Sequence, residues 1–201
     1  NVTTYTSFFT PDEQVQHEAL KAQLASLAGD CLQPDEVARI EALLTRAVEE
    51  GSLVRDSFGL NPLINNLQTA IIVVDEMGMR RAAIVSILLH DMVKCGYVTT
   101  EELAAQFGTD VASILNGLVR INKLYEKNPS IESENFRNLL LSFAEDMRVI
   151  LIMIADRVNT MRQIKDAPNE EARLKVAGEA AYLYAPLAHK LGLYKLKSEL
   201  E

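Results

Sequence analysis

The sequence predicts an all-α fold, a single multi-helix bundle of about ten helices, and three observations support this prediction. Apolar residues recur with helical spacing in nearly every segment. Helix start signals, a capping residue followed by proline or acidic residues, recur along the chain, and glycines stand where helices should end. No alternation typical of a strand persists over more than four residues.

Proline and capping residues mark the helices of the first half of the chain. Thr10, Pro11 and Glu13 supply an N-cap, a proline at the first helical position and the acid of a capping box. Pro34 and Pro62 open two further helices in the same way. The helices expected here span residues 10–29, 34–50, 62–78 and 80–95, and a loop rich in Gly, Asp and Ser covers 52–61.

The second half continues the helical pattern with shorter links. Thr99 caps a short helix that ends at Gly108, and Asn128-Pro129 ends the next one. Gly192 precedes a last helix at the end of the chain. The helices expected here span residues 99–107, 110–127, 133–145, 146–165 and 169–187, with the last starting after 192.

Composition and charge exclude some classes of function. The net charge of −8 and a pI near 5.0 argue against a nucleic-acid-binding surface over the whole molecule. Cys31 and Cys95 form no disulfide framework, which suits a reducing cytoplasm. We expect no membrane segment, because the longest apolar run is only Val149–Ala155. Since the first residue is not methionine and the last residues continue a helical pattern, we expect the chain to be a fragment.

Two charged motifs lie inside apolar segments. His90-Asp91 follows the apolar run Ala82–Leu89, and Asp156 lies in the most apolar helix of the chain. An unpaired carboxylate in such a place would cost several kcal/mol. Asp156 therefore needs a partner, which is either an internal ion pair with Arg157 or Arg162, or a metal ion. A lone histidine before an aspartate is weak evidence for a metal site.

Several blocks in the same order resemble a known family. These are Phe107–Ala112 with Gly117–Val119, Asn135–Leu141, Asp146–Leu151 with Ala155–Arg157, Tyr184–Gly192 and Leu196–Glu201. The chain resembles the N-terminal HD domain of long RelA/SpoT proteins, which make and degrade the alarmones (p)ppGpp of the stringent response. The resemblance implies an HD-domain helical bundle over residues 55–190, loosely matched helices over 1–54, and a linker helix over 191–201. A GTP pyrophosphokinase domain would follow Glu201.

The resemblance also implies a metal site. In that family a manganese ion is held by a histidine, a His-Asp pair and a distant aspartate. The corresponding residues are His90, Asp91 and Asp156, but Asn66 occupies the position of the first histidine. An amide oxygen replaces a nitrogen donor that suits manganese better, so we expect this site to be vestigial and weakly occupied or empty.

Further departures fall on the residues that would carry the reaction. The family has an acidic pair after His-Asp, and this chain has Lys94-Cys95 there, which changes the charge near the metal by about three units. Each unit of charge interacts with another unit charge about 6 Å away by roughly 3 kcal/mol. Thr160 stands where an asparagine would contact the nucleotide. The resemblance leaves Arg55, Arg157 and Thr160 as candidate substrate-binding residues. It matches Arg55-Asp56-Ser57 to the family's Arg-x-Ser base-binding loop, with two extra residues before Pro62.

The sequence therefore predicts a hydrolase-inactive HD domain that regulates its own synthetase domain. Two alternatives stay open: a weakly active, manganese-dependent (p)ppGpp 3′-pyrophosphohydrolase, and a nucleotide-binding module without catalysis. Expected partners are the synthetase domain and a guanine nucleotide such as (p)ppGpp. We expect contact with the ribosome only through parts of the parent protein outside this chain.

The remaining candidates have simpler interpretations. His17 is expected to be solvent-exposed on a polar stretch, and Cys31 to be structural. His189 is expected to pack between helices. Glu132 and Glu134 are expected to stabilise the start of a helix.

Overall fold

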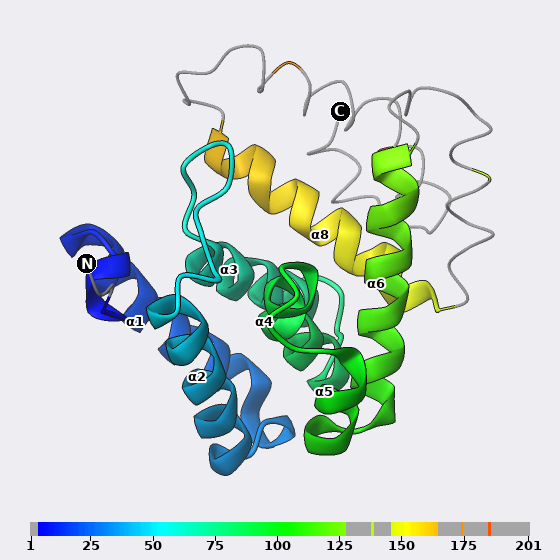
Figure 1. Cartoon of the computed structure of the whole chain (residues 1–201), viewed down its shortest axis with the longest axis horizontal. Coiled ribbons are helices and arrows are strands. Elements are labelled where there is room, and N and C mark those ends of the chain that lie inside the picture. Colours follow the sequence, from blue (N-terminus) through cyan, green and yellow to red (C-terminus); the bar gives the residue numbers. More distant parts are fainter. Residues whose placement is uncertain (1–3, 128–137, 139–145, 165–173, 175–184, 186–201) are drawn as a thin grey trace. The chain divides into compact units, whose positions relative to one another are not determined.

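Helices form every regular element in the part of the chain that the computed structural model describes, which is residues 4–127, 138, 146–164, 174 and 185 (Figure 1). The all-α prediction is confirmed for these residues. The α-helices are α1 Pro11–Ala28, α2 Pro34–Glu49, α3 Pro62–Asp75, α4 Arg81–Lys94, α5 Thr100–Phe107, α6 Thr109–Lys127 and α8 Met147–Ile164. Two short 3-10 helices, η1 Thr6–Phe8 and η2 Gly29–Cys31, flank α1.

Not every expected helix can be compared with the structure. The helices predicted over 133–145 and 169–187, and the last one after 192, lie outside the described residues, as do Glu132, Glu134 and His189. The structure therefore does not confirm the expected number of ten helices. The chain divides into two compact units, residues 1–116 and 117–201. The domain division expected near residues 54 and 190 remains a prediction.

The predicted capping box at the start of α1 is present. The backbone N–H of Glu13 donates to Thr10 Oγ1 at 3.2 Å, and the backbone N–H of Thr10 donates to Glu13 Oε1 at 2.9 Å. Pro11 fills the first helical position, where a missing N–H costs nothing. Gly29, with φ of 55°, ends the helix in a conformation that suits glycine.

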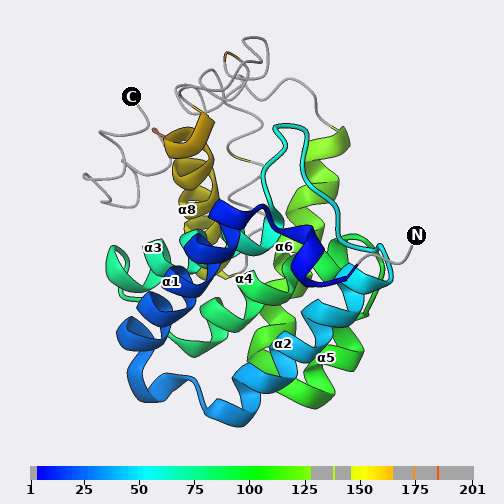
Figure 2. The same ribbon diagram turned by 90° about the vertical axis from the view of Figure 1, so that its left-hand side faces the viewer.

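In the first unit α1 packs on α3, α3 on α4, and α4 on α2. Figure 2 shows α1 and α2 joined at one end by the short link that contains η2. The apolar faces of α2, α3, α4 and α5 meet in a mostly aliphatic core, as expected for a chain without tryptophan. Its fully covered members include Ala47, Val85, Leu89, Met92 and Leu103. The first two helices, whose role the sequence left open, are thus part of the core that holds α3 and α4.

A buried ion pair ties three segments of this unit together. The Glu36 carboxylate on α2 is only 7% exposed and accepts two hydrogen bonds from Arg81 of α4, at 3.0 and 2.6 Å. Arg81 also donates to the carbonyl oxygen of Phe107, at 2.6 Å, at the end of α5. Because a buried carboxylate without a partner is costly, this fork specifies how α2, α4 and α5 assemble.

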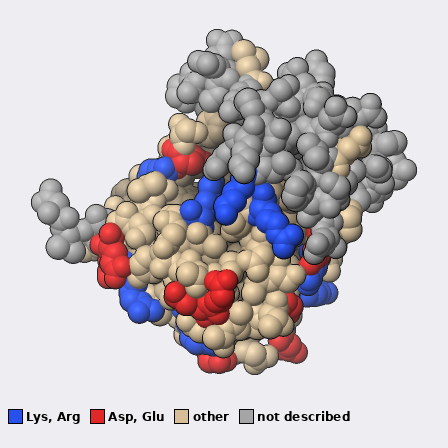
Figure 3. Space-filling view, turned by 45° about the vertical axis from the view of Figure 1, so that its right-hand side comes forward, with Lys and Arg blue, Asp and Glu red and all other residues tan. Residues whose placement is uncertain are grey.

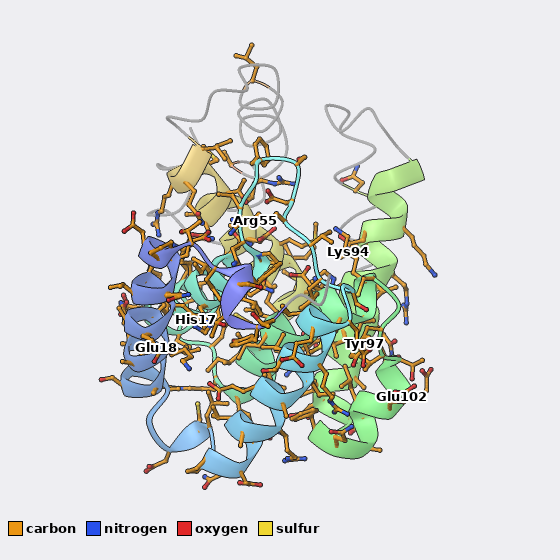
Figure 4. All side chains as sticks on the ribbon, turned by 60° about the vertical axis from the view of Figure 1, so that its left-hand side comes forward. His17, Glu18, Arg55, Lys94, Tyr97 and Glu102 are labelled. Atoms are coloured by element: carbon orange, nitrogen blue, oxygen red, sulfur yellow. The ribbon has the colours of Figure 1, made fainter. Side chains whose placement is uncertain are left out.

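The prediction that His17 is exposed is wrong. His17 is 7% exposed, and its ring centroid lies 4.6 Å from that of Phe9 and 6.3 Å from that of Tyr5. Figure 4 shows His17 on the inner side of α1 and Glu18 on the outer side. The segment that precedes α1 folds back over this helix, and its aromatic residues cover His17. Burial lowers the pKa of the His17 imidazole, and the nearby Lys21 ammonium lowers it further.

None of the described helices combines the length and apolarity needed to cross a bilayer. The face shown in Figure 3 carries basic and acidic side chains with uncharged surface between them.

Candidate functional site

Two adjacent helices of the first unit carry the residues at the centre of the predicted site. Asn61 caps α3, because its side-chain oxygen accepts a hydrogen bond from the Leu63 backbone N–H at 3.0 Å. Asn66 lies five residues further along the same helix, and Asp91 lies on α4. The structure brings these two side chains together: Asn66 Nδ2 donates to Asp91 Oδ2 at 2.7 Å.

The direction of this hydrogen bond determines what the pair can do. A carboxylate only accepts, so the Asn66 amide must present its N–H group to Asp91. The bond is charge-assisted and short for its type. In this arrangement one carboxylate oxygen of Asp91 already accepts a hydrogen bond from the amide nitrogen of Asn66. Toward Asp91, Asn66 therefore presents a proton and not a lone pair that could bind a metal ion.

The His-Asp pair lies at the border of the core. Leu89 and Met92, which flank the pair in sequence, are completely buried, whereas His90 and Asp91 are half-buried. The expectation of a buried helix with a charged pair near its end is confirmed, because α4 ends at Lys94. Both polar side chains are therefore within reach of water.

Lys94 and Cys95 lie at the exposed end of α4. The Cys95 backbone N–H donates to the carbonyl oxygen of Asp91 at 3.0 Å and closes the last turn of the helix, and Gly96 follows with φ of 81°. Lys94 stands in the last turn, where a cation is favourable at the negative end of the helix dipole. Figure 4 shows Lys94 on the opposite side of the first unit from His17. The exposure of Lys94 and Cys95 is therefore explained by their position at the end of a helix.

Arg55 lies in the loop between α2 and α3, above His17 in Figure 4, and its guanidinium forms hydrogen bonds with other residues of the chain. Nη1 donates to Glu13 Oε2 at 2.9 Å, and Nη2 forms a short hydrogen bond with Glu13 Oε1. The hydrogen bond from Arg55 holds the pKa of the Glu13 carboxyl below its ordinary value. The guanidinium also donates to the carbonyl oxygens of Gly59 and Phe8, at 2.9 and 3.1 Å.

The carbonyl oxygen of Phe8 links this loop to α3. It accepts from Arg55 Nη2 and also from Asn61 Nδ2, at 3.2 Å. Asn61 is 2% exposed and, as the cap of α3, leads directly into the helix that carries Asn66. The sequence did not reveal that residues 8 and 13 belong to this region. The one signal was the aromatic cluster before Thr10, which indicated a segment able to fold back.

The other predicted site residues lie on α8, in the second unit. Asp156 and Arg157 are half-buried, and Thr160 is 7% exposed. The Thr160 hydroxyl donates to the carbonyl oxygen of Asp156 at 3.0 Å, which is a bond within its own helix. Asp146 accepts from the backbone N–H of Arg148 at 2.9 Å near the start of α8, and the Arg148 guanidinium holds the pKa of the Asp146 carboxyl below its ordinary value.

The comparison with protein families agrees with this arrangement. The family described as HD domain matches residues 55–194, which include α3, α4 and α8. The chain belongs to the HD-domain family. Its relatives further identify it as an HD domain of the RelA/SpoT type.

Three relatives show what this HD domain is similar to. A guanosine-3′,5′-bis(diphosphate) 3′-pyrophosphohydrolase of Aquifex aeolicus is 41% identical over 126 residues, which is 63% of this chain and 18% of the relative. A GTP pyrophosphokinase of Myxococcus xanthus is 38% identical over 144 residues, 69% of this chain and 19% of the relative. The bifunctional (p)ppGpp synthase/hydrolase SpoT of Escherichia coli is 31% identical over 173 residues, 85% of this chain and 24% of the relative.

This HD domain therefore spans about a fifth of the length of these relatives. The relatives are named for hydrolysis, for synthesis or for both, so their names do not decide which reaction, if any, this chain performs.

Proposed function

We propose that this chain is a hydrolase-inactive HD domain of a RelA/SpoT-type (p)ppGpp enzyme and that it regulates an adjoining GTP pyrophosphokinase domain. The observation that carries the proposal is the hydrogen bond from Asn66 to Asp91 at the position of two implied metal ligands. An amide that donates to the carboxylate replaces an imidazole that would share a metal ion with it.

The residues of the first unit do not fit the manganese ion that the family implies. His90 and Asp91 carry side chains with lone pairs, but the atom of Asn66 that faces Asp91, at 2.7 Å, is the amide nitrogen, which has no lone pair to give; the amide would have to turn for its oxygen to share a metal ion with Asp91. The oxygen that it would then offer lacks the nitrogen character that manganese favours. We infer that manganese is bound weakly or not at all, and we derive no catalytic step through it.

The end of α4 supports the same conclusion. Lys94 and Cys95 occupy the positions of the family's acidic pair, and both are exposed residues of a helix end. Neither supplies the carboxylate that would exchange a proton with an attacking water, a contribution of typically 10²- to 10⁴-fold in rate. The fold is retained while the groups needed for the reaction are replaced.

A silent domain can still act on a neighbour by favouring one of its conformations. The relatives are far longer than this chain, and the Myxococcus xanthus relative is named as a GTP pyrophosphokinase. We propose that this domain docks on such a synthetase domain, beyond Glu201, and biases its open or closed state.

The proposal is tested by incubating the chain with ppGpp and Mn²⁺ and measuring GDP and pyrophosphate. We expect no turnover above the rate without protein. The triple variant Asn66→His, Lys94→Glu, Cys95→Asp is expected to gain manganese-dependent turnover about a hundredfold or more above the rate without protein. Adding Asp91→Asn to that variant should abolish the gain. Measurable turnover of the wild type, as fast as that of the triple variant, would reject the proposal.

A weak hydrolase is the second candidate, because His90 and Asp91 are retained and several relatives, including the one from Aquifex aeolicus, are named as 3′-pyrophosphohydrolases. It predicts a slow reaction of the wild type that Asp156→Ala removes. If wild type and Asp156→Ala release equally little pyrophosphate, this candidate is excluded.

A further inference from the structure

The contact between Glu13 and Arg55 differs from the buried ion pair of the core. Arg55 is 34% exposed and Glu13 20% exposed, whereas the Glu36 carboxylate is 7% exposed. A partly exposed ion pair contributes little net stability, because water competes for both groups. Arg81 is 33% exposed, much like Arg55, so the two forks differ in the carboxylate: Glu13 meets more water than Glu36 does and can leave its arginine at lower cost.

The geometry at Arg55 suits an oxyanion. Two nitrogens of the guanidinium face the two oxygens of one carboxylate, an arrangement that binds a phosphate group equally well. Glu13 is an effective occupant because its carboxylate is charged at neutral pH, and the hydrogen bond from Arg55 holds the pKa of this carboxyl below its ordinary value. The negative charge of Glu13 is also favourable in the first turn of α1, so both the helix start and Arg55 stabilise the position of this side chain.

The loop that carries Arg55 is coupled to the centre of the site. The Phe8 carbonyl oxygen accepts from both Arg55 and Asn61, and Asn61 caps α3. Asn66 follows about 7.5 Å further along the helix axis. A nucleotide whose phosphate reached Arg55 would thus meet the helix that carries Asn66, and it would have to displace Glu13 to do so.

We propose that Glu13 is an intramolecular competitor for Arg55, an autoinhibitory contact by which the first turn of α1 excludes the phosphate of a guanosine polyphosphate. The inference rests on the proposed function for the ligand, and it adds the regulation of the same site. Rotation of the Glu13 side chain away from Arg55 frees the guanidinium and raises nucleotide affinity. Return of Glu13 closes the site.

The experiment measures binding of ppGpp by calorimetry in EDTA, so that no metal-dependent reaction interferes. The variant Glu13→Gln loses the charge but keeps an oxygen for the capping box. Asp12→Asn removes the same charge from an exposed residue of the same turn and is the matched control. If about one molecule in ten of the wild type has Arg55 free, Glu13→Gln binds about tenfold more tightly. Asp12→Asn stays within about twofold of the wild type, and Glu13→Gln with Arg55→Ala loses the gain.

A second variant distinguishes an effect on binding from loss of the fold. Glu13→Asp keeps the negative charge at the helix start but shortens the side chain, so that the fork to Arg55 cannot close fully. We expect it to bind ppGpp more tightly than the wild type as well, with an unchanged melting temperature. Equal affinity of wild type, Glu13→Gln and Glu13→Asp would overturn the proposal. Unfolding of both variants would also overturn it, because a contact that the fold cannot lose is not regulatory.

The affinities measured in EDTA test the role of Glu13 independently of the proposed function. If the wild type released pyrophosphate from ppGpp with Mn²⁺, the hydrolase-inactive assignment would fail, while the affinity ratio in EDTA would still decide the role of Glu13. If the wild type is inert and the ratio is one, only the autoinhibitory contact fails.

Discussion

Replacing Asn66 with aspartate tests the contact on which the proposed function depends. The substitution removes a 2.7 Å charge-assisted hydrogen bond and places a second carboxylate against Asp91. Loss of a hydrogen bond to a charged group costs about 1.5 kcal/mol or more. Two unit charges about 4 Å apart repel by about 4 kcal/mol at an effective dielectric of 20, and solvent screening of these half-buried groups reduces this to about 2 kcal/mol.

We therefore expect Asn66→Asp to lower the free energy of unfolding by about 3.5 kcal/mol at pH 7, and Asn66→Ala by about 1.5 kcal/mol. Urea unfolding followed by circular dichroism measures both. Asn116→Asp, at an exposed position of α6, makes the same chemical change and should stay within about 0.5 kcal/mol of the wild type.

The pH dependence gives an independent check. In the Asn66→Asp variant, repulsion between the introduced carboxylate and Asp91 raises the pKa of one of the two carboxyls, so the penalty is present above that pKa and is relieved as the pH falls. The gap between Asn66→Asp and the wild type should narrow as the pH is lowered from 7 towards about 4. The reasoning is refuted if Asn66→Asp and Asn66→Ala are equally stable at pH 7, or if the gap does not depend on pH.

Three further predictions concern the supporting structure. Glu36→Ala leaves Arg81 with the more distant carboxylate of Asp110, at 3.6 Å, and because Arg81 is also 33% exposed we expect a loss of about 3 kcal/mol in urea unfolding, at the low end for a buried pair. A loss below about 0.5 kcal/mol would contradict the structural role of the fork. The folded-state pKa of His17 is lowered by burial, so the unfolded chain takes up a proton first as the pH falls, and stability should decrease below pH about 6.5. His17→Phe should lose less stability between pH 7.5 and 5.5 than the wild type, and an identical loss would show that another group is responsible. A Cβ at Gly117 would lie 2.6 Å from Val149 Cγ2, so Gly117→Ala should lower the free energy of unfolding by about 1–3 kcal/mol. Adding Val149→Ala to this variant should recover part of that loss, and a Gly117→Ala variant as stable as the wild type would contradict this packing.

Local signals predicted the helices well. The capping box of Thr10 and Glu13 and the prolines at positions 11, 34 and 62 act within one helical turn, so they can be recognised without the fold. The predicted ends of α3 and α4 differ from the observed ones by one to three residues, because the last turn depends on packing and on the link that follows.

The candidate site was predicted in part. The resemblance placed Asn66 and Asp91 at ligand positions, and the structure brings them within hydrogen-bonding distance. It could not predict that these two side chains form a hydrogen bond with each other, which depends on how α3 packs on α4. Arg55 was predicted to bind a nucleotide, yet in the structure it binds Glu13, a residue 42 positions earlier in the chain.

The exposure of His17 was predicted wrongly for the same reason. Its neighbours in sequence are polar, so local composition indicated a solvated face. The ring is covered by Tyr5 and Phe9, which reach it only because the segment before α1 turns back.

The sequence by itself determined the helical class, the starts of most helices and the membership of the HD-domain family, because capping, periodicity and motif order are properties of neighbouring residues. Only the tertiary structure decided which polar groups share a hydrogen bond. The partners in the pairs Glu13–Arg55, Glu36–Arg81 and Asn66–Asp91 are separated by 42, 45 and 25 residues. Such contacts form when apolar helix faces pack, and no local pattern records which side chains that packing brings together.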